Sequence, residues 1–214
     1  LPQGPVACPL ALADRLDTLV GIFGIGQPPT GSRDPFALRR ASLAVLRILV
    51  EKSLDLDLKQ CLQQAAAGYP AGVIAAGTTA EVYDYMVERF RAWYEDEQIP
   101  VAVFRAVSAR DLPRPLDIHR RVLAVHAFAA LPEAQALAAA NKRVSNILGK
   151  LEDTHQFGEV SADLLAEPQE KALAEQVAAL RQSTAAHLEK DEYREALAAL
   201  VDERHPSHVQ HDVA

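Results

Sequence analysis

LADRLDTLVGIFGIGQPPTGSRDPFALRRA, residues 12–41, is the stretch that decides the fold of this chain. Its first part predicts a helix over residues 10–22, because four apolar side chains recur on one face, Leu12, Leu16, Leu19 and Val20. The glycines and prolines that come next predict that the chain loosens into a turn, Gly21, Gly24, Gly26, Pro28 and Pro29. A second helix is expected to start at Asp34 and Pro35, since aspartate caps free amides and proline suits the first helical position.

This second helix is predicted over residues 35–52 and is apolar almost all round. Its polar residues form a narrow stripe of Arg40, Arg47 and Glu51, with Arg39 beside it. A helix of this kind normally has neighbours on most sides. We therefore expect it to be the hub around which the other helices pack.

The remaining chain also has helical periodicity, and no alternation at period two is long enough for a sheet. We expect an all-α helical bundle array of about nine helices, the others over residues 56–67, from 78 onward, 101–109, 115–130, 132–148, 167–190 and 191–203. The glycine- and proline-rich break at 68–77 is a candidate domain boundary, and residues 205–214 are expected to form a frayed tail. The helix from Thr78 has a capping-box signature with Glu81, and one of its faces carries Val82, Met86, Phe90 and Trp93.

Composition and charge limit the classes of protein to which this chain can belong. Apolar residues make up 49% of the chain, no apolar run reaches the ~20 residues that span a bilayer, and no secretory signal is recognisable. The two isolated cysteines, Cys8 and Cys61, favour reduced thiols in a cytosol. Residues 85–150 carry 10 basic and 7 acidic side chains, whereas residues 151–214 carry 5 and 14. A polyanionic partner would therefore meet the middle of the chain.

Several patterns resemble ligand sites only weakly. The three glycines at 21, 24 and 26 match neither a phosphate loop nor a dinucleotide fingerprint, so a plain turn is favoured. Asp14 and Asp17 share a helix face that would suit a metal ion, but such a pair is more often a cap or a salt-bridge donor. No role is assigned to the histidines of the tail or of the middle, His205, His208, His211, His119 and His126.

The middle of the chain is a better candidate for function. Five arginines lie within 17 residues, Arg105, Arg110, Arg114, Arg120 and Arg121. On the helix over 132–148, the expected core face consists of Leu137, Ala140, Val144 and Ile147. The polar face carries Asn141, Lys142, Arg143, Ser145, Asn146 and Lys150. Cations hold phosphates and amides read base edges, and Tyr94 or Trp93 would stack on bases, although Trp93 lies on the apolar face. RNA binding is one interpretation of this surface, and a solvated surface is the other.

Three stretches together resemble one family. Residues 12–41, FRAWY at 90–94 and AAANKRVSNIL at 138–148 are similar in sequence, order and spacing to the β subunit of the bacterial heterotetrameric glycyl-tRNA synthetase. In that family the α subunit carries the class II catalytic centre for glycine and ATP, and the β subunit binds the tRNA and completes the active complex. The resemblance implies that residues 1–67 end an HD-like helical domain, 68–97 form a linker and bridging helix, and 98–214 form an anticodon-binding α-helical domain.

The chain departs from the family pattern at both ends, so we expect a fragment. It lacks the upstream His–Asp pair of an HD metal site, which leaves Asp14, similar to the last acidic ligand of that site, without partners. After residue 203 it lacks the closing helices of the anticodon-binding domain. Uncovered apolar faces are therefore expected on the helices at 167–190 and 191–203.

The resulting prediction is a part of the glycine–tRNA ligase β subunit with no catalytic residue or metal ligand of its own. The implied partners are tRNA(Gly) and the α subunit, with neither membrane nor DNA, in the cytoplasm. The chain is expected to bind no cofactor, whereas ATP, glycine and Mg²⁺ are implied for the complete enzyme. Contacts to the anticodon arm are expected from Asn141, Lys142, Arg143 and Asn146, and phosphate contacts from Arg110, Arg114 and Arg121. The alternatives are an HD-type metal-dependent phosphohydrolase using Asp14 and a purely structural helical module.

Overall fold

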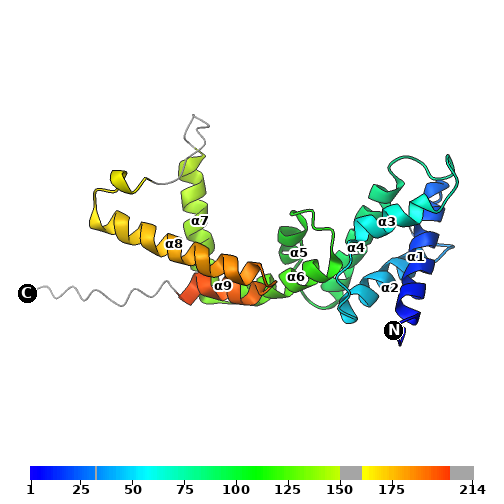
Figure 1. Ribbon diagram of the computed structural model, residues 1–214, viewed down its shortest axis with the longest axis horizontal. Coiled ribbons are helices and arrows are strands. Elements are labelled where there is room, and N and C mark those ends of the chain that lie inside the picture. Colours follow the sequence, from blue (N-terminus) through cyan, green and yellow to red (C-terminus); the bar gives the residue numbers. More distant parts are fainter. Residues whose placement is uncertain (32, 150–160, 203–214) are drawn as a thin grey trace, which may run out of the picture. The chain divides into compact units, whose positions relative to one another are not determined.

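The computed structural model describes residues 1–31, 33–149 and 161–202 of the chain. Within these ranges the chain forms nine α-helices and one short 3-10 turn, η1 (Ala162–Leu164), without a β-strand. The predicted all-α fold is therefore confirmed (Figure 1). The chain divides into two compact units, the first from Leu1 to Val122 and the second from Leu123 onward.

The first unit is built around α1 (Ala7–Gly24) and α2 (Leu38–Glu51). The four apolar side chains predicted to line one face of α1 are all buried. Helix α2 packs against α1 and against α4 (Thr78–Asp96), so its apolar surface is covered from two directions. The prediction of a central helix is confirmed by the buried residues of α2, Leu38, Ser42, Val45, Leu46, Ile48, Leu49 and Val50.

Two of the glycines expected in the turn lie inside α1 instead. A Cβ atom on Gly21 would lie 2.3 Å from the Tyr69 hydroxyl oxygen, and one on Gly24 would lie 2.5 Å from Cδ1 of Ile74. A loop from later in the chain therefore contacts the helix at positions where only glycine leaves room. The prediction that the chain loosens at Gly21 is wrong, because the left-handed turn residue is Gly26, with a φ of 73°.

Helix α2 begins at Leu38, three residues after the predicted first helical position. Asp34 still caps it, because its carboxylate oxygens accept hydrogen bonds from the backbone amides of Leu38 (2.8 Å) and Arg39 (3.0 Å). Pro35 is not the first helical residue, since Ala37 adopts a left-handed conformation with a φ of 55°. The capping residue was therefore predicted correctly and the first turn was not.

The start of α4 also differs from the prediction. The residue before the helix is Gly77, in a left-handed conformation with a φ of 86°, and no side chain caps the helix. Thr78 is the buried first residue of α4 rather than its cap. The expected capping box with Glu81 is therefore wrong, because glycine turns the chain into the helix instead.

Helix α4 packs against α1, α2 and α3 (Leu58–Ala67), so the break at 68–77 lies inside the first unit. The first unit also contains α5 (Val101–Ser108) and the start of α6 (Pro115–Ala129). The division between compact units falls after Val122, away from the predicted break. The domain assignment that the family resemblance implied stays a prediction.

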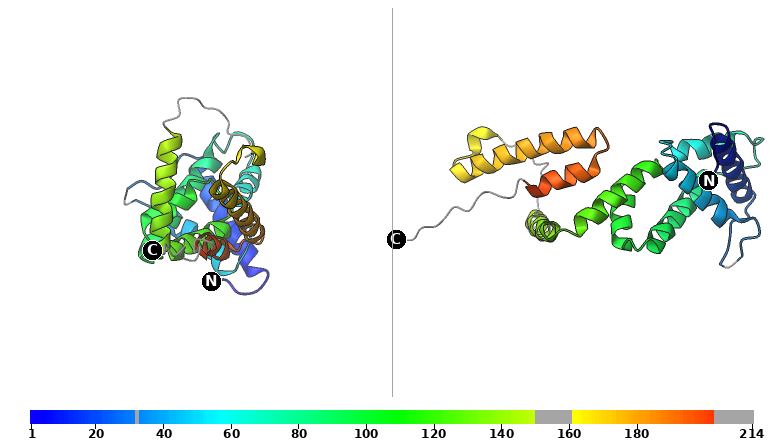
Figure 2. Two further views of the ribbon diagram at one scale, coloured as in Figure 1. Left: turned by 90° about the vertical axis from the view of Figure 1, so that its left-hand side faces the viewer. Right: turned by 90° about the horizontal axis from the view of Figure 1, so that it is seen from below.

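The second unit contains the end of α6, α7 (Pro132–Leu148), α8 (Pro168–Leu188) and α9 (Tyr193–Asp202). Helix α7 begins and ends at the predicted residues. Helices α8 and α9 lie side by side (Figure 2). Their contact buries Tyr193 and Ala196 of α9.

Apolar side chains of α7 and α8 are exposed within this unit. The predicted core face of α7 is wrong in its second half, because Val144 and Ile147 are 53% and 59% exposed. No residue of α8 is buried, and its exposed apolar side chains are Leu173, Val177 and Leu188. An uncovered apolar face was expected on both α8 and α9. It is found on α8, whereas no large apolar side chain of the described part of α9 is exposed. Exposed apolar surface of this kind commonly packs against another molecule or another segment of the chain.

We expect Gly24→Val to destabilise the first unit by about 1–3 kcal/mol, because the added methyl groups overlap Ile74. The matched control is Ala13→Val on the exposed side of the same helix, which changes only helix propensity and costs less than about 1 kcal/mol. Urea unfolding followed by the fluorescence of Trp93, the single tryptophan of the chain, measures both. Equal destabilisation by the two variants would contradict the close approach.

Candidate nucleic-acid interface

The predicted anticodon-arm residues lie on the second half of α7, where every residue from 141 to 149 is exposed. Arg143 and Asn146 are one turn apart, and Lys142 and Asn146 are separated by four positions, so all three share a side of the helix. Asn141 lies beside them, one turn before Ser145. Among the described residues, neither Lys142 nor Arg143 has an ion-pair partner. This part of α7 can therefore offer its charges and amides to a ligand.

The three predicted phosphate contacts belong to the first unit and differ from one another. Arg114 forms an ion pair with Asp55 (2.8 Å), and Arg121 forms one with the buried carboxylate of Asp117 (3.0 Å). A phosphate would have to compete with these carboxylates. Arg110, directly after α5, is exposed. The roles predicted for the three residues stay predictions, with Arg110 the most accessible to a ligand.

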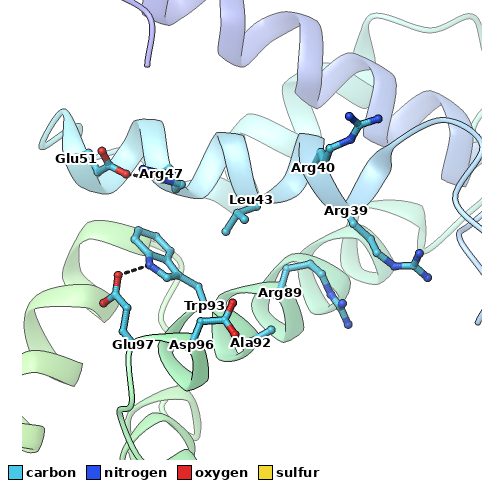
Figure 3. A pocket seen from close by; sticks show the side chains of 10 residues that line it. All are labelled: Arg39, Arg40, Leu43, Arg47, Glu51, Arg89, Ala92, Trp93, Asp96 and Glu97. Carbon is cyan, nitrogen blue, oxygen red and sulfur yellow. Dashed lines mark hydrogen bonds and ion pairs between the residues drawn. The ribbon is translucent and has the colours of Figure 1, made fainter. Parts of the chain in front are cut away.

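A cleft between α2 and α4 was not predicted. Its volume is about 540 Å³, within the size range of small-ligand sites. Figure 3 shows Arg39 and Arg89 extending from the two helices toward one end and Trp93 lying toward the other. Arginine, aromatic and acidic residues dominate its lining, which consists of Arg39, Arg40, Leu43, Arg47, Glu51, Arg89, Ala92, Trp93, Asp96 and Glu97.

The arginines of this cleft are not equally available. Arg47 donates to the carboxylate of Glu51 one turn away, which neutralises it. Arg39 donates to the carbonyl oxygen of Gly31, a neutral acceptor. Neither Arg39 nor Arg89 forms an ion pair within the described part of the chain. One end of the cleft therefore holds two guanidinium groups that form no ion pair with the described residues.

Arg89 has a further feature. Its guanidinium carbon lies 5.5 Å from the ring centroid of Tyr85. Its Nε atom is shielded from solvent and has no hydrogen-bond acceptor among the described residues. A shielded donor without an acceptor is unusual in a folded protein.

The aromatic residues of α4 are arranged differently from the prediction. Tyr94 is buried, with 1% of its surface exposed, whereas Trp93, expected in the core, is partly exposed and lines the cleft. The Tyr94 hydroxyl and Nδ1 of His119 are hydrogen bonded at 2.9 Å. The indole of Trp93 stacks on Tyr94, with ring centroids 5.9 Å apart, and donates to the Glu97 carboxylate. Trp93 is therefore held in place rather than free to rotate.

The weaker ligand sites gain no support. The glycines at 21 and 24 are helical, so a phosphate loop there is wrong. Asp14 and Asp17 are exposed, and no group of three or more potential metal ligands occurs in the described part of the chain. Lys150 and the three tail histidines lie outside the described residues.

No single described helix is long and apolar enough to cross a membrane, and α6 with α7 meets that test only as a bent pair.

Comparison with known proteins identifies the family. Residues 1–109 match the family model described as glycyl-tRNA synthetase beta subunit. The matched range includes the cleft and both of its helices. The chain belongs to this family. The resemblance drawn from the three sequence stretches is therefore confirmed.

Similar members of this family are glycine–tRNA ligase beta subunits. The proteins from Citrobacter koseri and Pseudomonas aeruginosa are 52% and 53% identical over 206 residues, which is 96% of this chain and 30% of each relative. The protein from Actinobacillus pleuropneumoniae is 52% identical over 206 residues. The chain thus spans about 30% of the length of the curated relatives that it matches.

The partly buried ring of His119 gives the first unit a pH dependence. Burial lowers its pKa from the ordinary 6.5, so the folded state favours the neutral ring that is bonded to Tyr94. The unfolded chain binds the proton at higher pH, so this stability is fully present above about pH 6.5 and is lost as the pH falls through the folded-state pKa. An NMR titration of His119 is expected to show a midpoint below 6.5.

The matching variant is His119→Gln, which lacks the titrating group. Between about pH 7 and pH 5.5 the unfolding midpoint in urea is expected to fall more for the unaltered chain than for the variant. A midpoint for His119 at or above 6.5, or parallel pH profiles for the two proteins, would show that the folded state does not favour the neutral ring.

Proposed function

We propose that this chain is the part of a glycine–tRNA ligase β subunit that recognises tRNA(Gly) and joins it to the synthetase complex in the cytoplasm. The complex would charge tRNA(Gly) with glycine at the expense of ATP, with Mg²⁺, at a catalytic centre on the α subunit. The observation that carries the proposal is the exposed α7 surface, whose cations have no ion-pair partner among the described residues, in a chain that belongs to this family.

The chemistry of the α7 surface fits this role. Lys142 and Arg143 supply positive charge for phosphates, which gives affinity without sequence preference. Asn141 and Asn146 carry amides, each with a donor and an acceptor that can pair with the edge of an unstacked base. Anticodon loops offer such bases. In this proposal the cations hold the RNA and the asparagines discriminate among bases.

A second role, packing against another part of the synthetase, is favoured by one observation. Val144 and Ile147 are exposed on α7 beside the polar residues. A helix that contacts RNA on one side and protein on another would explain both surfaces. If α7 serves only as a packing surface, removing its cations will leave tRNA affinity unchanged.

The test is a titration of tRNA(Gly) against the unaltered chain and Arg143→Ala at two salt concentrations. We expect the variant to bind about 3- to 10-fold more weakly and to lose about one unit of the slope of log K against log salt. The matched control is Arg194→Ala, another exposed arginine of the second unit, which should leave both values unchanged. Equal binding by the unaltered chain and Arg143→Ala, or binding without salt dependence, would contradict the proposal.

A further inference from the structure

We propose that the cleft between α2 and α4 binds one nucleotide of a single-stranded RNA, with the phosphate at the arginine end and the base beside Trp93 (Figure 3). The proposal rests on the proposed function only in taking RNA as the partner. The cleft lies in the first unit and α7 in the second, so the two sites can be tested separately.

The arginine end has the chemistry of a phosphate site. Arg39 and Arg89 come from different helices and extend toward the same end of the cleft (Figure 3). Neither is neutralised by a carboxylate in the described part of the chain. A phosphate oxygen would supply a charged acceptor to two guanidinium groups that now face only a backbone carbonyl and a tyrosine ring. Two guanidinium groups that approach from opposite sides can hold one phosphate between them.

The other end has the chemistry of a base site. Trp93 lies there, and the apolar side chain of Leu43 lines the cleft between it and the arginine end. The stacking of Trp93 on Tyr94 and its hydrogen bond to Glu97 fix the indole before any ligand arrives. Little conformational entropy would then be lost on binding, which favours stacking of a base on the part of the indole that lines the cleft.

The carboxylates indicate which bases are preferred. Three carboxylates line the cleft, and ionised carboxylates can only accept hydrogen bonds. Glu51 and Glu97 already accept from Arg47 and Trp93, whereas Asp96 has no side-chain partner among the described residues. Cytosine, adenine and guanine carry an exocyclic amino group that donates two hydrogens, whereas uracil has none. We therefore expect cytosine to bind more tightly than uracil, the base of the same size without that donor.

The same carboxylates argue against an acidic peptide as the occupant. Such a peptide would be attracted to Arg39 and Arg89 but repelled where Asp96 and Glu97 line the cleft. A nucleotide carries its charge at one end and its donors at the other, which matches the distribution of charge in the cleft. An acidic peptide is therefore the competing outcome of the test.

The experiment uses the fluorescence of Trp93, which is the single tryptophan in the chain and needs no label. Six-nucleotide oligomers of cytidine and of uridine are titrated into the full chain at low salt. Cytidine oligomers are expected to quench Trp93 at several-fold lower concentration than uridine oligomers, and added salt should weaken both. A polyglutamate peptide serves as the acidic competitor.

Two variants test the arginine end. Arg89→Met keeps the apolar stem of the side chain and removes its charge, and Arg39→Ala removes the facing guanidinium. Each should weaken the quenching by cytidine oligomers about tenfold. The matched control is Arg91→Ala, two residues from Arg89 on α4, whose guanidinium is already paired with Glu88 and Glu95. Its oligomer binding should be unchanged, and urea unfolding confirms that every variant is folded.

Each result decides the proposal. It is overturned if neither oligomer quenches Trp93, if cytidine and uridine oligomers quench alike, or if polyglutamate quenches as strongly and depends on the same arginines. Unchanged quenching by Arg89→Met or Arg39→Ala, with normal unfolding, also overturns it. The result is independent of the α7 test, because Arg143→Ala should leave oligomer quenching intact and Arg89→Met should leave the contribution of α7 to the salt slope intact.

Discussion

The burial of α2 between α1 and α4 is the constraint on which the first unit depends. Because seven of the fourteen residues of this helix are buried, its polar side chains are left only a narrow stripe. This stripe lies along the edge of the contact with α4, opposite Arg89 and Trp93 of that helix. The hydrophobic core thus determines the composition of the cleft, since the two helices can approach only with their charged residues at its margin.

The helices could be predicted from sequence because their cause is local. Apolar side chains at helical spacing located α1, α2 and α7, and Pro132 fixed the start of α7. The errors arose where the cause is distant or depends on one backbone angle. Gly24 was read as a turn residue because nothing near it in sequence shows that Ile74 contacts it. The left-handed conformation of Ala37 is equally invisible in a pattern of residue types.

The candidate sites were predictable to the same extent and for the same reason. The polar residues of α7 share one helix, so their spacing alone brought Arg143 and Asn146 together. The cleft joins residues about fifty positions apart and needed the packing of α2 on α4. Trp93 was predicted in the core, but the core residue is its neighbour Tyr94. Neighbouring positions on a helix differ by about 100°, and the Tyr94 hydroxyl finds a hydrogen-bond partner in the partly buried His119.

The arginines of this chain fall into two groups, those that are ion-paired with a carboxylate and those that are not. This difference is a better guide to phosphate binding than the number of arginines in a region. Arg47, Arg114 and Arg121 each face a carboxylate, so a phosphate that bound them would first have to displace an existing partner. Arg89 and Arg143 have no such partner among the described residues, and an incoming phosphate would gain their full charge. The count of basic residues drew attention to the middle of the sequence, yet Arg114 and Arg121 there are already paired with carboxylates. RNA contacts are therefore expected at the few guanidinium groups that the fold leaves unneutralised.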